Sequence, residues 1–176
     1  MTLFLLYMLQ YNSSDEIVYQ VGVPKDFSNE DLNLFVELLK LQGKVSTPTL
    51  IKVNRCKYLG LCINKGEIVS IGAIKPKTNS NFNGEKANLD ELRNKFDLEL
   101  GYCFTLPLHT GNGYSSQLVN LLLEKVSNEN VMSSTELRQD NGMLRILQKN
   151  GFKLTGQSWK SGVHGGELGL YLKYAK

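Results

Sequence analysis

Cysteine and histidine are scarce in this chain of 176 residues, which has three cysteines and two histidines. Cys56, Cys62 and Cys103 are odd in number and form no CxxC pair, which argues against a disulfide framework and against a zinc site. All three lie in apolar, strand-like contexts. We therefore expect reduced core cysteines, a cytoplasmic protein and no bound metal.

The chain also lacks a large excess of charge and a long hydrophobic run. Its 20 basic and 17 acidic residues are spread along the sequence, so no Lys/Arg cluster indicates a nucleic-acid partner. The apolar stretch over residues 1–11 is shorter than the ~20 residues of a membrane span and lacks the basic start of a secretion signal. We expect no membrane partner, and we interpret residues 1–15 as an apolar N-terminal strand or extension, for which a homodimer interface is one possible location.

The length and the 41% of hydrophobic residues predict one globular domain over residues 1–176. Residues 75–95 are polar and indicate a loop, and Asn88 followed by Leu89, Leu92 and Phe96 has the pattern of one short helix within it. Hairpins at both ends of the chain surround a central β-α-β crossover, so the expected class is α/β (α+β) with a mixed, mostly antiparallel sheet. Apolar periodicity predicts helices near residues 28–42, 115–126 and 140–150, and strands over 16–21, 58–63, 68–74, 96–105, 131–135, 152–158 and 167–174.

The most informative segment, residues 99–118, has the pattern of a strand, a glycine-rich turn and a helix start. Alternation along the strand predicts that Glu99 shares a face with Asp97, Gly101, Cys103 and Thr105. Small neighbours leave room for a ligand there, so Glu99 is a candidate general base. The alternative is a solvated or salt-bridged strand glutamate. The other face is expected to carry Phe96, Leu98, Leu100, Tyr102 and Phe104.

The turn itself, residues 111–116, predicts a phosphate site. Gly111 and Gly113 free backbone N–H groups, and the helix N-terminus adds a partial positive charge. The alternative is a tight strand-to-helix turn that needs glycine only for its backbone angles.

In this segment the chain resembles the GNAT superfamily of acyl-CoA-dependent N-acyltransferases, over roughly residues 16–174. The family signature Arg/Gln-x-x-Gly-x-Gly/Ala falls on residues 110–115, where Gly113 is kept, Ser115 replaces the last small residue and Thr110 replaces the Arg or Gln. Residues 140–152 resemble the family's second cofactor motif, an Asn-led helix that ends in Gly-Phe. Counting back from its glycine favours Asp140 over Asn141 as the leading residue.

The resemblance implies a sheet splayed at its middle, flanked by helices, with acetyl-CoA bound in the gap as acyl donor. It implies an N-acetyltransferase that acts on a small-molecule or peptide amine by direct attack, with Glu99 as the base. The family's tyrosine acid falls on Leu147, so that role does not carry over. The implied cofactor-binding residues are Phe104, Thr105 and Leu106 for pantetheine, Thr110, Gly111, Asn112, Gly113, Tyr114, Ser115 and Ser116 for pyrophosphate, and Asp140 and Asn141 from the second motif.

Two other functions remain open at this point. An acyl-CoA-binding or regulatory module that has lost turnover would explain the departures at Thr110 and Leu147. A dinucleotide-binding enzyme would use Gly111-x-Gly113-x-x-Ser116 for phosphate and Glu136 for ribose hydroxyls. A catalytic Cys103 is the least supported alternative, because no histidine lies nearby in sequence to activate it.

Overall fold

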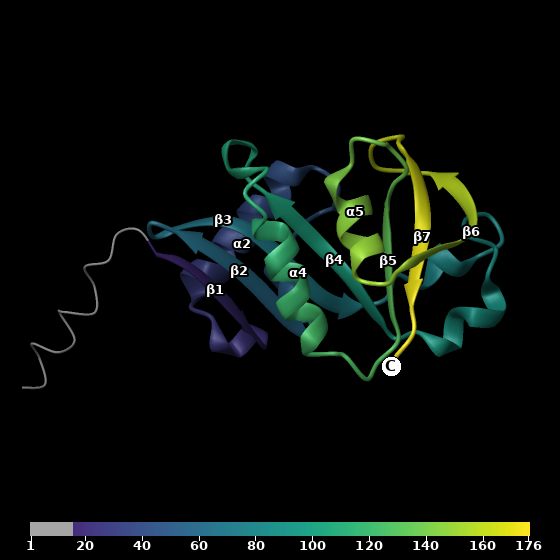
Figure 1. Ribbon diagram of the computed structural model, residues 1–176, viewed down its shortest axis with the longest axis horizontal. Helices are drawn as coiled ribbons and strands as arrows, with labels where there is room; N and C mark the ends of the chain where they lie inside the picture. Colours follow the sequence, from purple (N-terminus) through teal and green to yellow (C-terminus); the bar gives the residue numbers. More distant parts are fainter. Residues whose placement is uncertain (1–15) are drawn as a thin grey trace, which may run out of the picture.

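A seven-stranded sheet forms the centre of the protein (Figure 1). The computed structural model describes residues 16–176, so the N-terminal strand expected within residues 1–15 lies outside the described residues. All neighbouring strands are antiparallel except β4 and β5, which confirms the mixed, mostly antiparallel sheet. The strands, in the spatial order β1-β2-β3-β4-β5-β7-β6, are β1 (Ile17–Gly22), β2 (Tyr58–Asn64), β3 (Glu67–Pro76), β4 (Leu98–Thr105), β5 (Val131–Glu136), β7 (Glu167–Lys173) and β6 (Lys153–Lys160).

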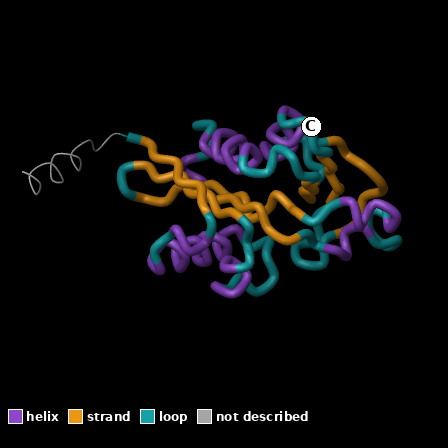
Figure 2. The backbone as a smooth tube through the Cα atoms, turned by 90° about the horizontal axis from the view of Figure 1, so that it is seen from below, coloured by secondary structure: helices purple, strands orange, loops and turns teal. Residues whose placement is uncertain are grey.

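Helices cover both faces of this sheet (Figure 2). On one face α2 (Asn29–Gln42) and α3 (Leu50–Asn54) enclose one hydrophobic cluster, and on the other α4 (Tyr114–Glu124) and α5 (Gly142–Lys149) enclose a second. None of the helices within residues 16–176 has the length and apolar character needed to cross a membrane.

Local sequence signals account for the helix that opens the fold. The Ser28 side chain accepts the backbone N–H of Asp31, whose carboxylate accepts the N–H of Ser28, so the two residues form a capping box at the start of α2. Gly43 ends α2 in the left-handed conformation. Phe35 and Leu39, four residues apart on one face of the helix, are fully buried against the sheet.

The segment between β3 and β4 is more ordered than its polar composition predicts. It contains two short 3-10 turns, Asn79–Phe82 and Asp90–Lys95. Phe82, Ala87 and Phe96 are fully buried and form a third cluster with side chains of β5, β6 and β7. Three apolar side chains therefore anchor this segment against the sheet, where it forms a wall beside β5.

The sheet is splayed between its two parallel strands. β4 and β5 pair only where Leu98 faces Val131 and Glu99 faces Met132. Beyond these residues the two strands no longer pair with each other, although β4 still pairs with β3 and β5 with β7. The Ser133 hydroxyl donates to the carbonyl oxygen of Leu100 over 2.9 Å just past the last pair. Glu99 therefore lies where the two strands part, and the splayed sheet implied by the resemblance is confirmed.

A β-bulge interrupts β4 immediately after this point. Gly101 faces Ala73 and Phe104 faces Ile71, so β4 carries one more residue than β3 over the same stretch. Tyr102 occupies the bulge with a φ of +58°. Such a φ is uncommon for a residue with a side chain, and no simple sequence pattern predicts it.

The bulge makes the expected alternation of β4 wrong beyond Gly101. Tyr102 and Phe104 pack on the α2 side of the sheet, whereas Leu100 and Cys103 pack on the α4 side. One inserted residue exchanges the faces of every side chain that follows it, because side chains along a strand alternate with a period of two. Cys103 therefore does not share a face with Glu99, and Tyr102 takes a place on that side.

Candidate functional site

The gap between β4 and β5 opens into a cavity of about 900 Å³. Its walls come from the connection between α2 and α3, the ends of β3 and β5, the middle of β4, the start of α5 and the loop between β6 and β7. Glu99 lines this cavity, as do Lys75, Tyr102, Glu136 and Asn141. The fold thus places side chains far apart in sequence around the point where the sheet parts.

The Glu99 carboxylate is buried and paired. Its Oε2 atom lies 2.6 Å from Lys75 Nζ and accepts the backbone N–H of Thr78 over 2.7 Å. Lys75 is the residue opposite Glu99 in the β3–β4 ladder, and both side chains are about nine-tenths buried. Glu99 is therefore a salt-bridged strand glutamate, which was one alternative from the sequence. It also faces a cavity, which the other alternative, a general base beside a ligand, requires.

Tyr102 is a site residue that the sequence did not identify. Its ring packs edge-on against Phe35 at a centroid distance of 6.5 Å, and Lys75 Nζ lies 5.4 Å from its centre. Burial, together with Cys56 and Glu99 nearby, raises the pKa of Tyr102 to about 12. The hydroxyl therefore stays protonated at neutral pH and remains a hydrogen-bond donor within the cavity wall.

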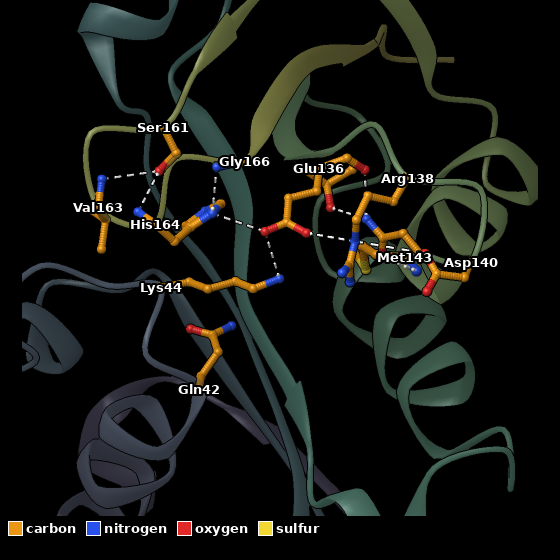
Figure 3. Close-up of polar contacts among 12 residues, drawn as sticks. Gln42, Lys44, Glu136, Arg138, Asp140, Met143, Ser161, Val163, His164 and Gly166 are labelled. Carbon is orange, nitrogen blue, oxygen red and sulfur yellow. Dashed lines mark hydrogen bonds and ion pairs between the residues drawn. The ribbon is translucent and has the colours of Figure 1, made fainter.

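A second buried carboxylate, Glu136, lies at the end of β5 (Figure 3). Glu136 Oε1 is 3.0 Å from His164 Nδ1 and 3.4 Å from Lys44 Nζ, and its Oε2 is 3.0 Å from Arg138 Nε. Lys44 follows α2, and His164 belongs to the loop between β6 and β7. These four residues, the Glu136 cluster, tie two loops to the end of β5 at the cavity.

The structure brings Asn141, rather than Asp140, into the cavity wall. Asn141 Oδ1 accepts the N–H of Met143 and caps α5, while its Nδ2 donates to Thr135 Oγ1 over 2.9 Å and to the Glu136 carbonyl over 2.8 Å. The Asp140 side chain is 79% exposed and lies 3.7 Å from Arg138. Asp140, the residue favoured by counting back from the glycine at the helix end, therefore lies outside the cavity wall.

The glycine-rich turn forms an open helix start. Gly113 precedes α4 without any side-chain cap, and both Gly111 and Gly113 have φ near +80° with no heavy atom within 4 Å of the position of a Cβ. The first-turn N–H groups of Tyr114, Ser115 and Ser116 therefore lack a side-chain cap, an arrangement suited to an anion. Thr110 and Asn112 use their side chains within the loop, on the carbonyls of Pro107 and His109.

This turn and the end of β4 lie outside the wall of the cavity, so the structure does not bring every implied cofactor residue into one place. The Leu106 N–H donates to Val69 O, and the Phe104 carbonyl and the Thr105 hydroxyl both contact the Ser70 hydroxyl. The Cys103 carbonyl accepts from Gln42 Nε2 over 2.8 Å. In Figure 1, α4 begins beside the end of β4, which places the turn at the head of the gap.

Comparison with known proteins identifies the fold. No family model matches the sequence, and no curated protein matches it. Among solved structures, Arabidopsis thaliana NAA60 in complex with a bisubstrate analogue superposes with a TM-score of 0.66 at 10% identity, covering 92% of this chain and 99% of that one. A GNAT-family acetyltransferase of Streptococcus pneumoniae gives 0.64 at 16% identity over 92% and 100%, and an N-acetyltransferase of Staphylococcus aureus Mu50 gives 0.64 at 14% identity over 92% and 99%.

The chain therefore has the fold of GNAT acetyltransferases. This result does not support the dinucleotide-binding alternative, which needs a parallel sheet whereas this sheet has a single parallel pair. Glu136, the residue assigned to ribose in that alternative, is instead held by Lys44, Arg138 and His164.

Cys103 is expected to be unreactive, and its replacement by alanine is expected to change turnover less than about threefold. Burial raises the pKa of Cys103 to about 12, so at pH 8 only about one thiol in ten thousand is ionised. Iodoacetamide labelling at pH 8, read by mass spectrometry, should modify Cys103 slowly in the native protein and rapidly in guanidinium. Rapid native labelling together with loss of turnover in Cys103→Ala would restore the nucleophile hypothesis.

Proposed function

We propose that this protein is an N-acetyltransferase that transfers the acetyl group of acetyl-CoA to a primary amine of a small molecule or peptide by direct attack. The observation that carries the proposal is the buried Glu99 carboxylate, which faces a cavity at the point where β4 and β5 part. The fold, shared with N-acetyltransferases over about nine-tenths of the chain, supports it.

The residues of this chain fit the donor. Acetyl-CoA supplies a thioester and a thiolate leaving group when bound. The uncapped start of α4 and the open backbone at Gly111 and Gly113 suit its pyrophosphate, because several N–H groups and the positive end of the helix meet there. We assign residues 110–116 to the phosphates, residues 104–106 to pantetheine, and Asn141 with its neighbour Asp140 to the second motif.

Glu99 is assigned the role of general base. An amine is mostly protonated at neutral pH and must lose a proton before it attacks the thioester. Lys75 and the Thr78 N–H both hold Oε2, and the Lys75 side chain also fills the space above Gly101. The carboxylate is thereby fixed in orientation, and Oε1 is the oxygen that we assign to the amine or to one water molecule in the cavity.

Glu99 takes the first proton, which the ammonium group loses before it attacks. The nitrogen–carbon bond then forms as the carbon–sulfur bond breaks, and the second nitrogen proton ends on the departing thiolate, directly or through water, so the step balances without a dedicated acid. The protonated Tyr102 hydroxyl is a further donor in the cavity wall. Leu147 is fully buried in the core between α5 and the sheet, so it takes no part in this chemistry.

An acyl-CoA-binding module without turnover is the second candidate, and the Lys75–Glu99 ion pair favours it. A carboxylate that already binds an ammonium group and a backbone N–H can have a purely structural role, as an ion pair that links β3 and β4. The same donor site would then bind acyl-CoA without acceptor chemistry.

The decisive test is calorimetric titration with acetyl-CoA beside NAD, followed by a thiol-release assay over a panel of amines. Binding of acetyl-CoA with amine-dependent thiol release is the expected result. Stoichiometric binding without release in any amine would support the binding module. Binding of NAD without binding of acetyl-CoA would overturn the assignment of the glycine-rich turn to acetyl-CoA, and with it both the transferase and the binding module.

A further inference from the structure

The cavity beside Glu99 contains more positive than negative side chains. Two carboxylates line it, Glu99 and Glu136. Five cationic side chains line it as well: Lys44, Lys52, Arg55, Lys75 and Lys86. What the cavity attracts depends on which of these charges already balance one another.

Both carboxylates are matched within the protein. Glu99 is held by Lys75 at 2.6 Å, and Glu136 is held by Lys44, Arg138 and His164. Neither carboxylate is therefore available as the main partner of a second positive charge on a ligand. A polyamine, which carries several ammonium groups, fits this cavity poorly.

The other three cations are not matched by acidic side chains within residues 16–176. Lys52 Nζ donates to the Ser46 carbonyl, and Lys86 Nζ donates to Ser80 Oγ over 2.9 Å and to Asn81 Oδ1 over 3.3 Å. No carboxylate of the described chain pairs with Lys52, Arg55 or Lys86. A cavity partly screened from water makes such unmatched charges attractive to an anion.

These cations approach the cavity from both sides of the gap. Lys52 and Arg55 belong to α3 and its end, which pack on β2, β3 and β4. Lys86 lies in the wall beside β5, with its Nζ 6.0 Å from the centre of the Trp159 ring of β6. A ligand lying in the cavity would therefore meet positive charge on two walls.

The donor's phosphates do not account for Lys52 and Arg55. The glycine-rich turn assigned to the pyrophosphate begins α4, and α4 packs on the face of the sheet opposite α3. The two cations therefore lie on the α2–α3 side of the sheet, away from the turn assigned to the phosphates.

We infer that the acceptor of this enzyme is a small amine that also carries a carboxylate or a phosphate, which Lys52 and Arg55 bind while the amine reaches Glu99. This inference rests on the proposed function and adds the substrate class to it. Lys86 supplies positive charge from the opposite wall.

The test compares acceptors that differ in one charged group. The C-terminal amide of glycyl-aspartate is paired with the C-terminal amide of glycyl-asparagine, and glucosamine 6-phosphate with glucosamine, so that one member of each pair has no anionic group and the two pairs distinguish a carboxylate from a phosphate. We expect kcat/KM to be at least about tenfold higher for the charged member of at least one pair, and the ratio to fall with added salt. In the double variant Lys52→Gln/Arg55→Gln the ratio of kcat/KM between the charged and the uncharged acceptor should fall to about one, because KM for the charged acceptor rises.

The matched control is Lys125→Gln/Lys149→Gln, which removes two exposed charges away from the cavity and should keep the preference. Equal kcat/KM within both pairs would overturn the inference, and so would a Lys52→Gln/Arg55→Gln variant that weakens acetyl-CoA binding instead. If no amine is acetylated, the proposed function fails, and calorimetric binding of the same four compounds then decides the inference. Tighter binding of a charged member, lost in the double variant, would support it, and equal binding would overturn it.

Discussion

Replacing Gly113 by valine is expected to weaken acetyl-CoA binding by at least about 100-fold. Gly113 has a φ of +77° directly before the first turn of α4, a conformation that a β-branched residue strongly disfavours. The backbone must move to relieve this strain, and it carries the N–H groups assigned to the pyrophosphate. Loss of two charge-assisted hydrogen bonds, each contributing about 1.5–3 kcal/mol, is enough for this effect. Calorimetric titration measures the dissociation constant directly.

A matched substitution separates the loss of the ligand site from general strain. Gly66, in the turn between β2 and β3, has a φ of +80° and equally open space around it, and it does not line the cavity. Gly66→Val should therefore lower the melting temperature about as much as Gly113→Val and leave acetyl-CoA affinity unchanged. Equal affinity in both variants would remove the phosphate assignment of residues 111–116.

Replacing Glu99 by glutamine is expected to lower kcat about 10²- to 10⁴-fold with acetyl-CoA affinity unchanged, because a positioned general base contributes about that much. The amide keeps the shape of the side chain but does not take the proton of the attacking amine. Raising the pH should restore part of the rate, since more of the amine then loses its proton to water. The measurement is a pH profile of thiol release with a saturating amine.

The Lys75–Glu99 pair requires two further variants. Glu99→Gln leaves the ammonium of Lys75 buried without its carboxylate, and breaking a buried pair this way costs about 3–5 kcal/mol. Lys75→Gln/Glu99→Gln removes both charges and should regain most of the lost stability without regaining turnover. Glu91→Gln, the same change at an exposed residue of the segment before β4, should leave both the stability and the turnover unaffected. Normal turnover in a folded Glu99→Gln protein would show that Glu99 has only a structural role.

Local signals in the sequence predicted most of the elements of this fold. Ser28 and Asp31 mark the start of α2, and Gly43 marks its end, through interactions that span only a few residues. The glycine-rich turn at the start of α4 and the crossover from β4 to β5 were likewise predicted, and together they carry the resemblance to the N-acyltransferases. Each of these features depends on neighbours in sequence.

The environment of the candidate base depended on contacts that the sequence does not show. Nothing near Glu99 in sequence indicates Lys75, because the pair is made by the register of β3 against β4. The bulge at Tyr102 was missed for a similar reason, since one inserted residue matters only relative to the partner strand. The Glu136 cluster joins three segments separated by tens of residues.

By itself the sequence determined the order of the helices and strands, the glycine-rich helix start and Glu99 as the candidate base. Those features follow from backbone conformation, capping and apolar periodicity, which act over a few residues. The tertiary structure alone decided which charges are paired, which side of β4 faces the cavity and which cations remain unmatched around it. Those properties depend on strand register and on the packing of distant segments, because the free energy of a charge is set by whatever surrounds it in space.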